Sequence, residues 1–347
     1  MRAPLIFDGH NDLLTRLYGA PDGPESVGGE GQGAIFAPAA REGGFAGGFF
    51  ALWVPSHVDV IAKMAAMQGD GYDMPLPGMV PQDEATKVVN DQIAIFDDLV
   101  RLGFLTQCRS VGDLRAAIGG DGMAAILHME GAEAIGPDLT ELDDYYDRGL
   151  RSLGPVWSRE TIFGHGVPFR FPSTGDTGPG LTDAGIRLVR RCDKLGIMLD
   201  LSHLNEAGFW DVARTSTRPL VATHSNAHAI SPHARNLTDA QLDAIAESDG
   251  MVGLNFAVAF LRPDGRMRAD VGIDVMLRHL DHLIDRLGEN RVGLGSDYDG
   301  AMVPEDLTSV ADLPRLRSAM RDHGYDDALM EKLCHGNWLR VLEKSWA

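Results

Sequence analysis

The sequence has few cysteines and no long apolar run. Its three cysteines, Cys108, Cys192 and Cys334, lie far apart in 347 residues and form no CxxC pair. This spacing supports neither a disulfide framework nor a cysteine zinc site, so we expect buried thiols in a reducing compartment. No apolar stretch approaches the length of a membrane span, and the apolar run in MRAPLIFDGHND is too short for a signal peptide. We therefore expect a cytoplasmic protein without a membrane partner.

Basic residues are also scarce. Lys and Arg together number 31 against 50 Asp and Glu, which leaves a formal net charge of -19. Nucleic acids and anionic membrane surfaces attract clustered basic residues, so neither is an expected partner. Hydrophobic residues make up 44% of the chain, enough to bury one large core or two ordinary ones.

Eight short apolar runs bounded by turn residues predict β-strands. Most of them are apolar at consecutive positions, which is typical of strands covered on both faces. The runs are LIF (5–7), FFALWV (49–54), AAILHM (124–129), LRSLGPV (150–156), IMLDLS (197–202), LVAT (220–223), MVGLNF (251–256) and VGLGS (292–296).

Helical periods lie between these runs. Apolar residues share one helix face over 89–100 and again over 273–287, and Thr238 with Gln241 forms a capping box. Glycines precede strands where a preceding helix ends, at Gly196, Gly250 and Gly288.

The alternation of eight strands with helices predicts a single (β/α)8 TIM barrel over residues 1–347. An open doubly wound sheet is the alternative, but no glycine-rich phosphate fingerprint follows an early strand. Long strand-to-helix loops are expected at 19–47, 56–81 and 157–180, the last two as lids or walls of a site. A C-terminal helix pair is expected at 330–344.

Metal-ligand and acid/base residue types occupy the ends of five predicted strands. In a barrel, functional groups sit where strands end, so these side chains are expected to converge on one axis. Each alone has an ordinary structural explanation, such as a carboxylate favoured at a helix start, but their joint placement favours a common site. The residues are His10, Asp12, Glu130, His203, His224 and Asp297.

This donor set predicts a centre for two divalent ions bridged by Glu130. Nitrogen and carboxylate donors without thiolate suit Zn²⁺ first, with Mn²⁺, Fe²⁺ or Co²⁺ as alternatives. Two ions roughly 3.5 Å apart share a water, lower its pKa and present a hydroxide nucleophile. Asp297 would take the proton and pass it to the leaving group, so the implied chemistry is hydrolysis.

Several of these motifs resemble those of a known protein family. The segments HND, HMEG, DLSH, ATHSNA with HARN, and GSDYDG resemble the membrane (renal) dipeptidase family of the amidohydrolase superfamily, in the same order from residue 6 to about 300. The resemblance implies a (β/α)8 barrel with a binuclear zinc centre that cleaves dipeptides, including L,D-dipeptides in many members. The resemblance also implies a homodimer and a C-terminal segment, residues 330–344, that packs around the barrel.

The resemblance also implies roles for individual residues. His10 and Asp12 would bind one zinc, Glu130 would bridge, and His203 with His224 would bind the other. Asp297 matches the catalytic acid/base, and Arg235 in HARNLTD matches the arginine that grips the terminal carboxylate of the substrate. A guanidinium pairs bidentately with a carboxylate, which suits that role.

One position departs from the family pattern. Where better-known members have a histidine that polarises the scissile carbonyl, this chain has Trp157. An indole donates one N–H and carries no positive charge. Either the second zinc alone polarises the carbonyl, or His165 in FGHG swings in to help.

The other histidines are expected to have supporting roles. His128 lies two residues before Glu130 and is expected behind the site, and His228 and His233 are expected near the pocket. The remaining ones are expected to be structural or exposed: His57, His279, His282, His323 and His335.

The sequence thus predicts a zinc-dependent dipeptidase whose substrate is a small dipeptide. Hydrolysis of N-acyl amino acids or lactones on the same metals is the alternative within enzymes, and Trp157 leaves room for it. A non-catalytic metal-dependent binding protein is disfavoured, because Asp297 serves proton transfer rather than binding. A phosphoesterase would need more basic residues near the site than Arg235 supplies.

Overall fold

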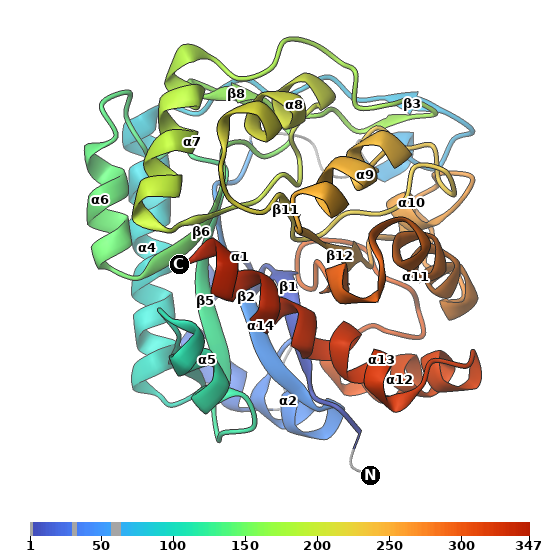
Figure 1. Cartoon of the computed structure of the whole chain (residues 1–347). Helices are drawn as coiled ribbons and strands as arrows, with labels where there is room; N and C mark the ends of the chain where they lie inside the picture. Colours follow the sequence, from blue (N-terminus) through green and yellow to red (C-terminus); the bar gives the residue numbers. More distant parts are fainter. Residues whose placement is uncertain (1–2, 30–32, 57–63) are drawn as a thin grey trace.

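A computed structural model describes residues 3–29, 33–56 and 64–347. In this part of the chain, eight parallel strands with surrounding helices form a (β/α)8 barrel (Figure 1). All eight predicted strands are confirmed. They are β1 (Ile6–Asn11), β2 (Phe45–Trp53), β5 (Met123–Glu130), β6 (Leu150–Gly154), β10 (Met198–Leu199), β11 (Val221–Ala222), β12 (Met251–Asn255) and β13 (Val292–Gly295).

The strands lie side by side in chain order. Pairing runs from β10 through β6, β5, β2, β1, β13 and β12 to β11, and a parallel bridge between Asp200 and Val221 completes the ring. The open doubly wound sheet is thereby excluded. Because all strands are parallel, their carboxyl ends meet at one end of the barrel.

Helices cover the outside of the ring, and several short segments extend the loops. The predicted periods at 89–100 and 273–287 lie in α4 (Gln82–Arg101) and α11 (Ile273–Leu287). The other helices are α1 (Leu13–Leu17), α2 (Ala37–Gly43), α5 (Val111–Ala117), α6 (Thr140–Asp147), α7 (Asp183–Leu195), α8 (Glu206–Thr215), α9 (Asp239–Glu247), α10 (Val258–Leu261), α12 (Leu313–Asp322), α13 (Asp327–Glu331) and α14 (Asn337–Ser345), with single 3₁₀ or π turns at Pro24–Gly28, Glu289–Arg291, Val310–Asp312 and Lys332–Gly336.

Helix ends follow the expected chemistry at most joints. Thr238 and Gln241 form the predicted capping box of α9, and Gly196 and Gly288 have positive φ after α7 and α11. Between α9 and β12, the residue with a left-handed backbone conformation is Asp249 (φ 57°), and not the predicted Gly250. Gly250 is needed for a different reason, because a Cβ there would collide with the carbonyl of Leu220.

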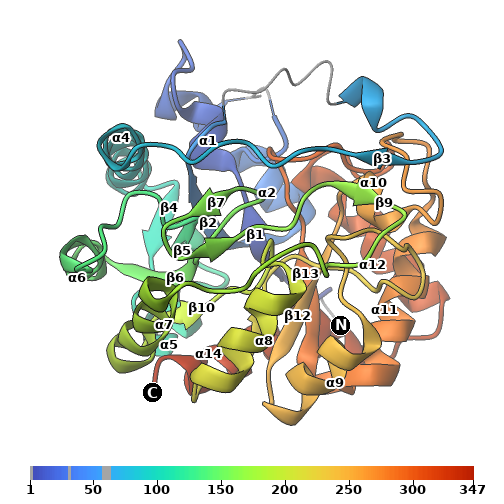
Figure 2. The ribbon, with the colours of Figure 1, turned by 90° about the horizontal axis from the view of Figure 1, so that it is seen from above.

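Two of the predicted long loops meet above the strand ends. The short strands β3 (Tyr72–Asp73) and β9 (Arg170–Phe171) pair antiparallel and join the loop after β2 to the loop after β6 (Figure 2). Within the second loop, β7 (Glu160–Thr161) and β8 (Gly164–His165) form a hairpin. A further short strand, β4 (Leu105–Gln107), pairs with β5 outside the ring.

The barrel interior is filled from the end opposite the loops by α14. Trp338 is fully buried, its ring lies 5.1 Å from that of Phe49, and its Nε1–H donates to the Leu294 carbonyl (3.2 Å). A Cβ at Gly9 or Gly293 would collide with the Trp338 ring. The C-terminal segment therefore belongs to the barrel core, which is more than the predicted packing around the outside. In Figure 1 it is the dark red helix labelled α14, next to the C-terminus.

The three cysteine side chains lie in the interior of the protein. Cys108, Cys192 and Cys334 are free and buried, as predicted, and burial raises their thiol pKa values. Among the described helices, not one combines the length and the apolar character that crossing a bilayer requires.

His279 in α11 gives a testable pH dependence of stability. Its Nδ1 accepts the N–H of Ala227 (3.2 Å) and its Nε2 lies 2.9 Å from the Leu261 carbonyl oxygen, so the fully buried ring is neutral. Burial lowers the pKa of His279 from 6.5 to about 4. The unfolded chain therefore binds this proton first as pH falls, and stability is lost between pH 6.5 and 4.

We expect this one histidine to remove about 3 kcal/mol of unfolding free energy between pH 7 and pH 4. Urea unfolding at both pH values measures it, with His279→Gln as the control, because glutamine offers a donor and an acceptor but does not titrate. An equal pH dependence in both proteins would contradict the assignment.

Candidate active site

The predicted ligands converge at the carboxyl ends of the strands. His10 lies near the end of β1, where the pairing with β2 changes register, and irregular pairing of this kind re-aims side chains. Asp12 precedes α1, Glu130 ends β5, and His203 and His224 follow β10 and β11. All five are at most 5% exposed, although they come from four different strands.

Glu130 is the centre of the group. Its Oε1 lies 3.0 Å from His203 Nε2 and 3.4 Å from His224 Nε2, and its Oε2 lies 3.8 Å from His10 Nε2. The His10 Nε2 is also 3.3 Å from Asp12 Oδ2. Three imidazole Nε2 atoms thus lie around one buried carboxylate, and the Asp12 carboxylate lies beside one of these imidazoles.

The charges in this group oppose one another. Burial lowers the pKa of His10, but the carboxylates of Glu130, Asp12 and Asp297 outweigh burial and raise it to about 10. Burial raises the pKa of Glu130 well above its usual range, against the attraction of His10. Burial, together with the nearby cations His10 and Arg235, holds the pKa of His224 well below its usual range.

The donor chemistry fits divalent metal ions. His203 Nε2 and His224 Nε2 lie 3.1 Å apart, closer than two imidazoles without a shared proton or cation would remain. His10 Nδ1 is a buried atom without a hydrogen-bond partner among the described residues. Three triads that share His10 each place their ligand atoms within 4.8 Å of one another: His10, Glu130 and His224; His10, Asp12 and Asp297; and His10, His128 and Asp200. Imidazole and carboxylate donors in this number are typical of zinc and related ions.

Asp297 stands beside these ligands in a constrained conformation. It follows β13 with φ 59°, a region that few residues other than glycine occupy. Its Oδ2 accepts a hydrogen bond from Asn255 Nδ2 (3.0 Å), and a Cβ at Gly300 would collide with Asp12 and approach Asp297. Asn255, at the end of β12, did not emerge from the sequence, although a polar residue ending an apolar strand was the available signal.

Arg235 is buried next to the same carboxylates. It is 4% exposed, its Nη2 donates to the His224 carbonyl (3.1 Å), and its guanidinium lies 5.4 Å from the centre of the Phe260 ring. Burial lowers the pKa of Arg235 to about 10, opposed by Asp297 and Glu130, so the group stays positive at neutral pH. Its Nε has no hydrogen-bond partner in the described structure, and a ligand carboxylate would satisfy it.

A cavity of about 300 Å³ opens onto this group. Asp12, Glu130, His203 and Asp297 form its polar wall. The facing wall is apolar and includes Trp53, Met67, Trp157, Phe169, Phe260 and Met267. The cavity suits a small molecule with one polar and one apolar part.

Trp157 lines the cavity, whereas His165 lies outside it. The Trp157 ring lies 5.7 Å from that of His203 and 5.2 Å from that of Trp53, so Trp157 is part of the cavity wall. The structure does not bring His165 into the cavity: it lies in the β7–β8 hairpin, where its Nδ1 is 3.2 Å from Glu160 Oε1 and where its backbone pairs with Glu160.

A buried ion pair that sequence reasoning missed joins three loops of the site. Arg159 is fully buried, and its Nε and Nη2 donate to Glu133 Oε1 at 2.9 and 2.7 Å. It also donates to Ser56 Oγ (2.7 Å) and to the Val54 carbonyl (3.0 Å). Arg159 therefore holds the loops after β2, β5 and β6 together around the cavity.

The remaining histidines occupy supporting positions. His128 is buried behind the ligands, and His233 Nδ1 accepts the backbone N–H of Arg235 (3.0 Å). His228 Nε2 lies 2.9 Å from the Ser173 carbonyl oxygen. His282 and His323 contact aspartates, and His335 contacts the Leu5 carbonyl. His57 lies outside the described residues.

A (β/α)8 barrel with buried imidazole and carboxylate groups at its strand ends is typical of metal-dependent hydrolases of the amidohydrolase type. A family model described as membrane dipeptidase (peptidase family M19) matches residues 1–346. The chain therefore belongs to the membrane dipeptidase family.

The chain is also similar to individual proteins and solved structures. The chain is similar to a metallo peptidase from Rhodobacter sphaeroides, solved with a phosphinate mimic of the dipeptide L-Ala-D-Ala, with 54% identity, a TM-score of 0.97 and coverage of 99% of this chain and 100% of that one. A Klebsiella pneumoniae protein from the pqqA 5′ region is 47% identical over 257 residues, 74% of this chain and 95% of the relative. The probable dipeptidase PvdM from Pseudomonas aeruginosa is 21% identical with a TM-score of 0.82, covering 99% and 96%, and shows the shared fold.

Proposed function

We propose that this metallo-dipeptidase hydrolyses L,L- and L,D-dipeptides with two Zn²⁺ ions, with Mn²⁺, Fe²⁺ or Co²⁺ as the alternatives. The observation that carries the proposal is the convergence of three imidazole nitrogens on Glu130, with Asp12 beside His10. The phosphinate mimic of L-Ala-D-Ala in the Rhodobacter relative supports the substrate class. A homodimer and a cytoplasmic location stay predictions from the sequence.

The ions would be held by His10 and Asp12 on one side and by His203 and His224 on the other, with Glu130 between them. Divalent ions there would supply an activated water and a Lewis acid. Asp297 lies beside His10 and Asp12, where it can accept a proton from the attacking water and return it to the leaving amine. Asn255 holds the Asp297 carboxylate by its Oδ2, which leaves Oδ1 for proton transfer.

Arg235 would bind the terminal carboxylate of the substrate, and the apolar wall would receive side chains. Arg235 is fixed by the His224 carbonyl, so the distance from its guanidinium to the metal ligands is set by the fold. A carboxylate placed there fixes which peptide bond reaches the ligands, and this restricts cleavage to dipeptides. Trp157 would contribute apolar contact, and a role for His165 would require its loop to move.

A comparison of dipeptides with their C-terminal amides tests this role of Arg235. We expect the wild type to cleave L-Ala-L-Ala and to leave the amide almost untouched. Arg235→Lys keeps the charge but loses the planar fork, and we expect a roughly 100-fold lower kcat/KM for the dipeptide, equivalent to about 3 kcal/mol. Arg286→Met, which removes a surface arginine paired with Asp243, is the control.

Equal cleavage of dipeptide and amide by the wild type would contradict the carboxylate role. Cleavage of N-acyl amino acids in preference to dipeptides would favour the alternative reaction. The apolar wall around Trp53 and Trp157 is the observation that favours it, because an acyl chain fits there without needing a partner for a free amine.

A further inference from the structure

A polar layer lies inside the barrel beneath the proposed metal ligands. Along β5, Ala124 and Ile126 belong to the apolar interior, and the next residue on that face is His128, two before Glu130. Along β10 and β11 the same alternation leads from apolar residues to Asp200 and Thr223. Barrel interiors usually carry aliphatic side chains at such depth, so a buried polar layer calls for a function.

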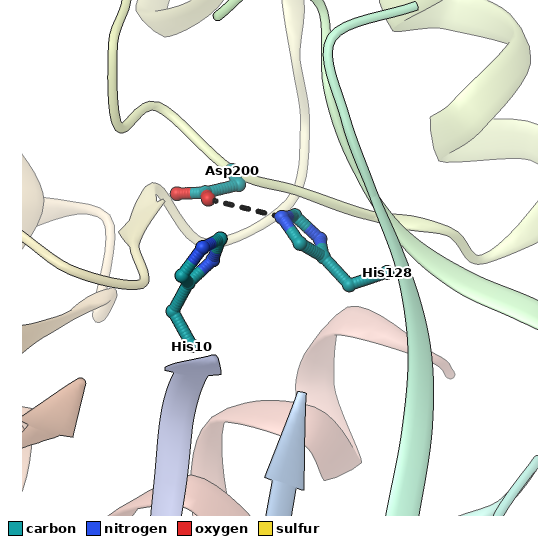
Figure 3. A group of neighbouring side chains, drawn as sticks. All are labelled: His10, His128 and Asp200. Atoms are coloured by element: carbon teal, nitrogen blue, oxygen red, sulfur yellow. Dashed lines mark ion pairs between the residues drawn. The ribbon is translucent and has the colours of Figure 1, made fainter. Parts of the chain in front are cut away.

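Asp200 is the centre of this layer. Its Oδ1 accepts the backbone N–H groups of Ser202 (3.0 Å) and Thr223 (2.8 Å), and its Oδ2 accepts the Thr223 hydroxyl (2.5 Å). The same Oδ2 lies 3.6 Å from His128 Nε2. Figure 3 shows the Asp200 carboxylate facing the rings of His10 and His128. Asp200 is 1% exposed, and its Oδ2 also lies 3.9 Å from His224 Nδ1.

The hydrogen-bond directions follow from the number of protons. The Thr223 hydroxyl has one hydrogen, and a carboxylate only accepts, so the hydrogen points to Asp200. Thr223 Oγ1 also lies 2.8 Å from His224 Nδ1, and toward that nitrogen it acts as the acceptor. The hydrogen of neutral His224 is therefore on Nδ1. The lone pair is on Nε2, the atom that faces Glu130.

We propose that Asp200 and Thr223 are positioning residues that hold His224 in its metal-binding tautomer and orientation. We call the two hydrogen bonds that lead from His224 through Thr223 to Asp200 the relay. Without the relay, the His224 ring is free to place its hydrogen on Nε2, where it would block a metal ion. The inference rests on the metal centre of the proposed function and adds residues that are not among the ligands proposed there.

Three glycines on neighbouring strands support the special position of Thr223. A Cβ at Gly9 on β1, at Gly253 on β12 or at Gly295 on β13 would collide with the Thr223 carbonyl. None of the three has positive φ, so conformational freedom does not explain them. They leave room for the Thr223 backbone inside the barrel, which in turn fixes the hydroxyl between Asp200 and His224.

The direct test is the zinc affinity of Thr223→Val in the full chain, measured by competition with a chromogenic chelator. Valine keeps the shape and removes the hydroxyl, and we expect a 10–100-fold weaker affinity, as for other partners of ligand histidines. Thr223→Ser should restore near wild-type affinity. Thr161→Val is the matched control, since Thr161 is also buried and hydrogen-bonded, but to the Pro155 carbonyl.

Asp200→Asn tests the direction of the relay. The two backbone N–H groups retain the amide oxygen at the Oδ1 position, so the NH₂ group faces Thr223 and donates to it. The hydroxyl must then donate to His224 Nδ1, which moves the ring hydrogen to Nε2. We expect zinc affinity to fall at least as far as in Thr223→Val. The double variant should bind no worse than Asp200→Asn alone, because the hydroxyl that imposes the wrong tautomer is gone.

The ¹⁵N chemical shifts of the His224 ring report the tautomer without any metal or activity. Hydrogen on Nδ1 in the wild type and on Nε2 in Asp200→Asn supports the relay, and hydrogen on Nε2 in the wild type overturns it. Unchanged zinc affinity in Thr223→Val, a loss equal to that of Thr161→Val, or no recovery with serine would also overturn it. Absence of zinc binding by the wild type would refute the metal centre itself, and the ¹⁵N shifts would still test the relay.

Discussion

Asp297→Asn is expected to lower kcat for dipeptide hydrolysis by about 10²–10⁴-fold, the range for loss of a general acid or base. Asparagine has the same shape, tolerates the positive φ of this position and can still contact Asn255, but it neither takes nor delivers a proton. Steady-state kinetics on zinc-loaded protein measure the effect. Metal content determined on the same samples separates a lost proton transfer from a lost ion, since Asp297 lies close to His10 and Asp12.

Asp249→Asn is the matched control. Asp249 also has positive φ, but it lies before β12, where it contacts Arg291, Arg340 and Lys344. We expect kcat to stay near the wild-type value there, with a modest loss of stability. An Asp297→Asn enzyme that retains more than a tenth of wild-type kcat with two bound ions would remove Asp297 from proton transfer.

Trp338→Ala is expected to cost about 3–5 kcal/mol of unfolding free energy, the range for deleting a buried tryptophan. The indole fills the end of the barrel between Phe49 and the glycines of neighbouring strands, and its N–H satisfies the Leu294 carbonyl. The surrounding backbone is part of a closed sheet and cannot collapse into the space. Urea unfolding followed by circular dichroism gives the loss.

Two further variants separate this explanation from a general effect of removing tryptophan. Trp338→Phe should recover part of the stability, because a ring still fills most of the space, while the hydrogen bond and one ring of the indole are lost. Trp210→Ala removes a half-buried indole of α8 that packs on Phe209, and a smaller loss is expected. Equal losses for Trp338→Ala and Trp210→Ala would show that Trp338 does not plug the barrel.

The barrel was predictable because its strands are buried on both faces and therefore stand out as apolar runs between turn residues. The short pairs β3–β9 and β7–β8 were not, since two-residue strands carry no periodicity. The segment that carries Trp338 was predicted as a helix, but not its insertion into the barrel. A helical pattern shows which face is apolar and leaves open what that face packs against.

The convergence of the candidate ligands was predictable because parallel strands bring their ends together, whatever the details of the loops. Contacts that depend on side-chain orientation were not: Asn255 on Asp297, Arg159 on Glu133 and Thr223 on Asp200 each join residues more than 20 positions apart. The position of His165 also depends on local loop structure, which the sequence did not indicate. Its place in a loop motif suggested proximity to the site, and the β7–β8 hairpin places it outside the cavity.

The measurement that tests the central claim most directly is dipeptide hydrolysis during titration of metal-free protein with Zn²⁺. L-Ala-L-Ala and L-Ala-D-Ala are the substrates, and amine release is followed at each addition. We expect no activity without metal and a rise to a plateau at two equivalents, because the ligands form two sets that share Glu130. Activity in the metal-free protein, or no turnover of either dipeptide with two ions bound, would contradict a binuclear zinc dipeptidase.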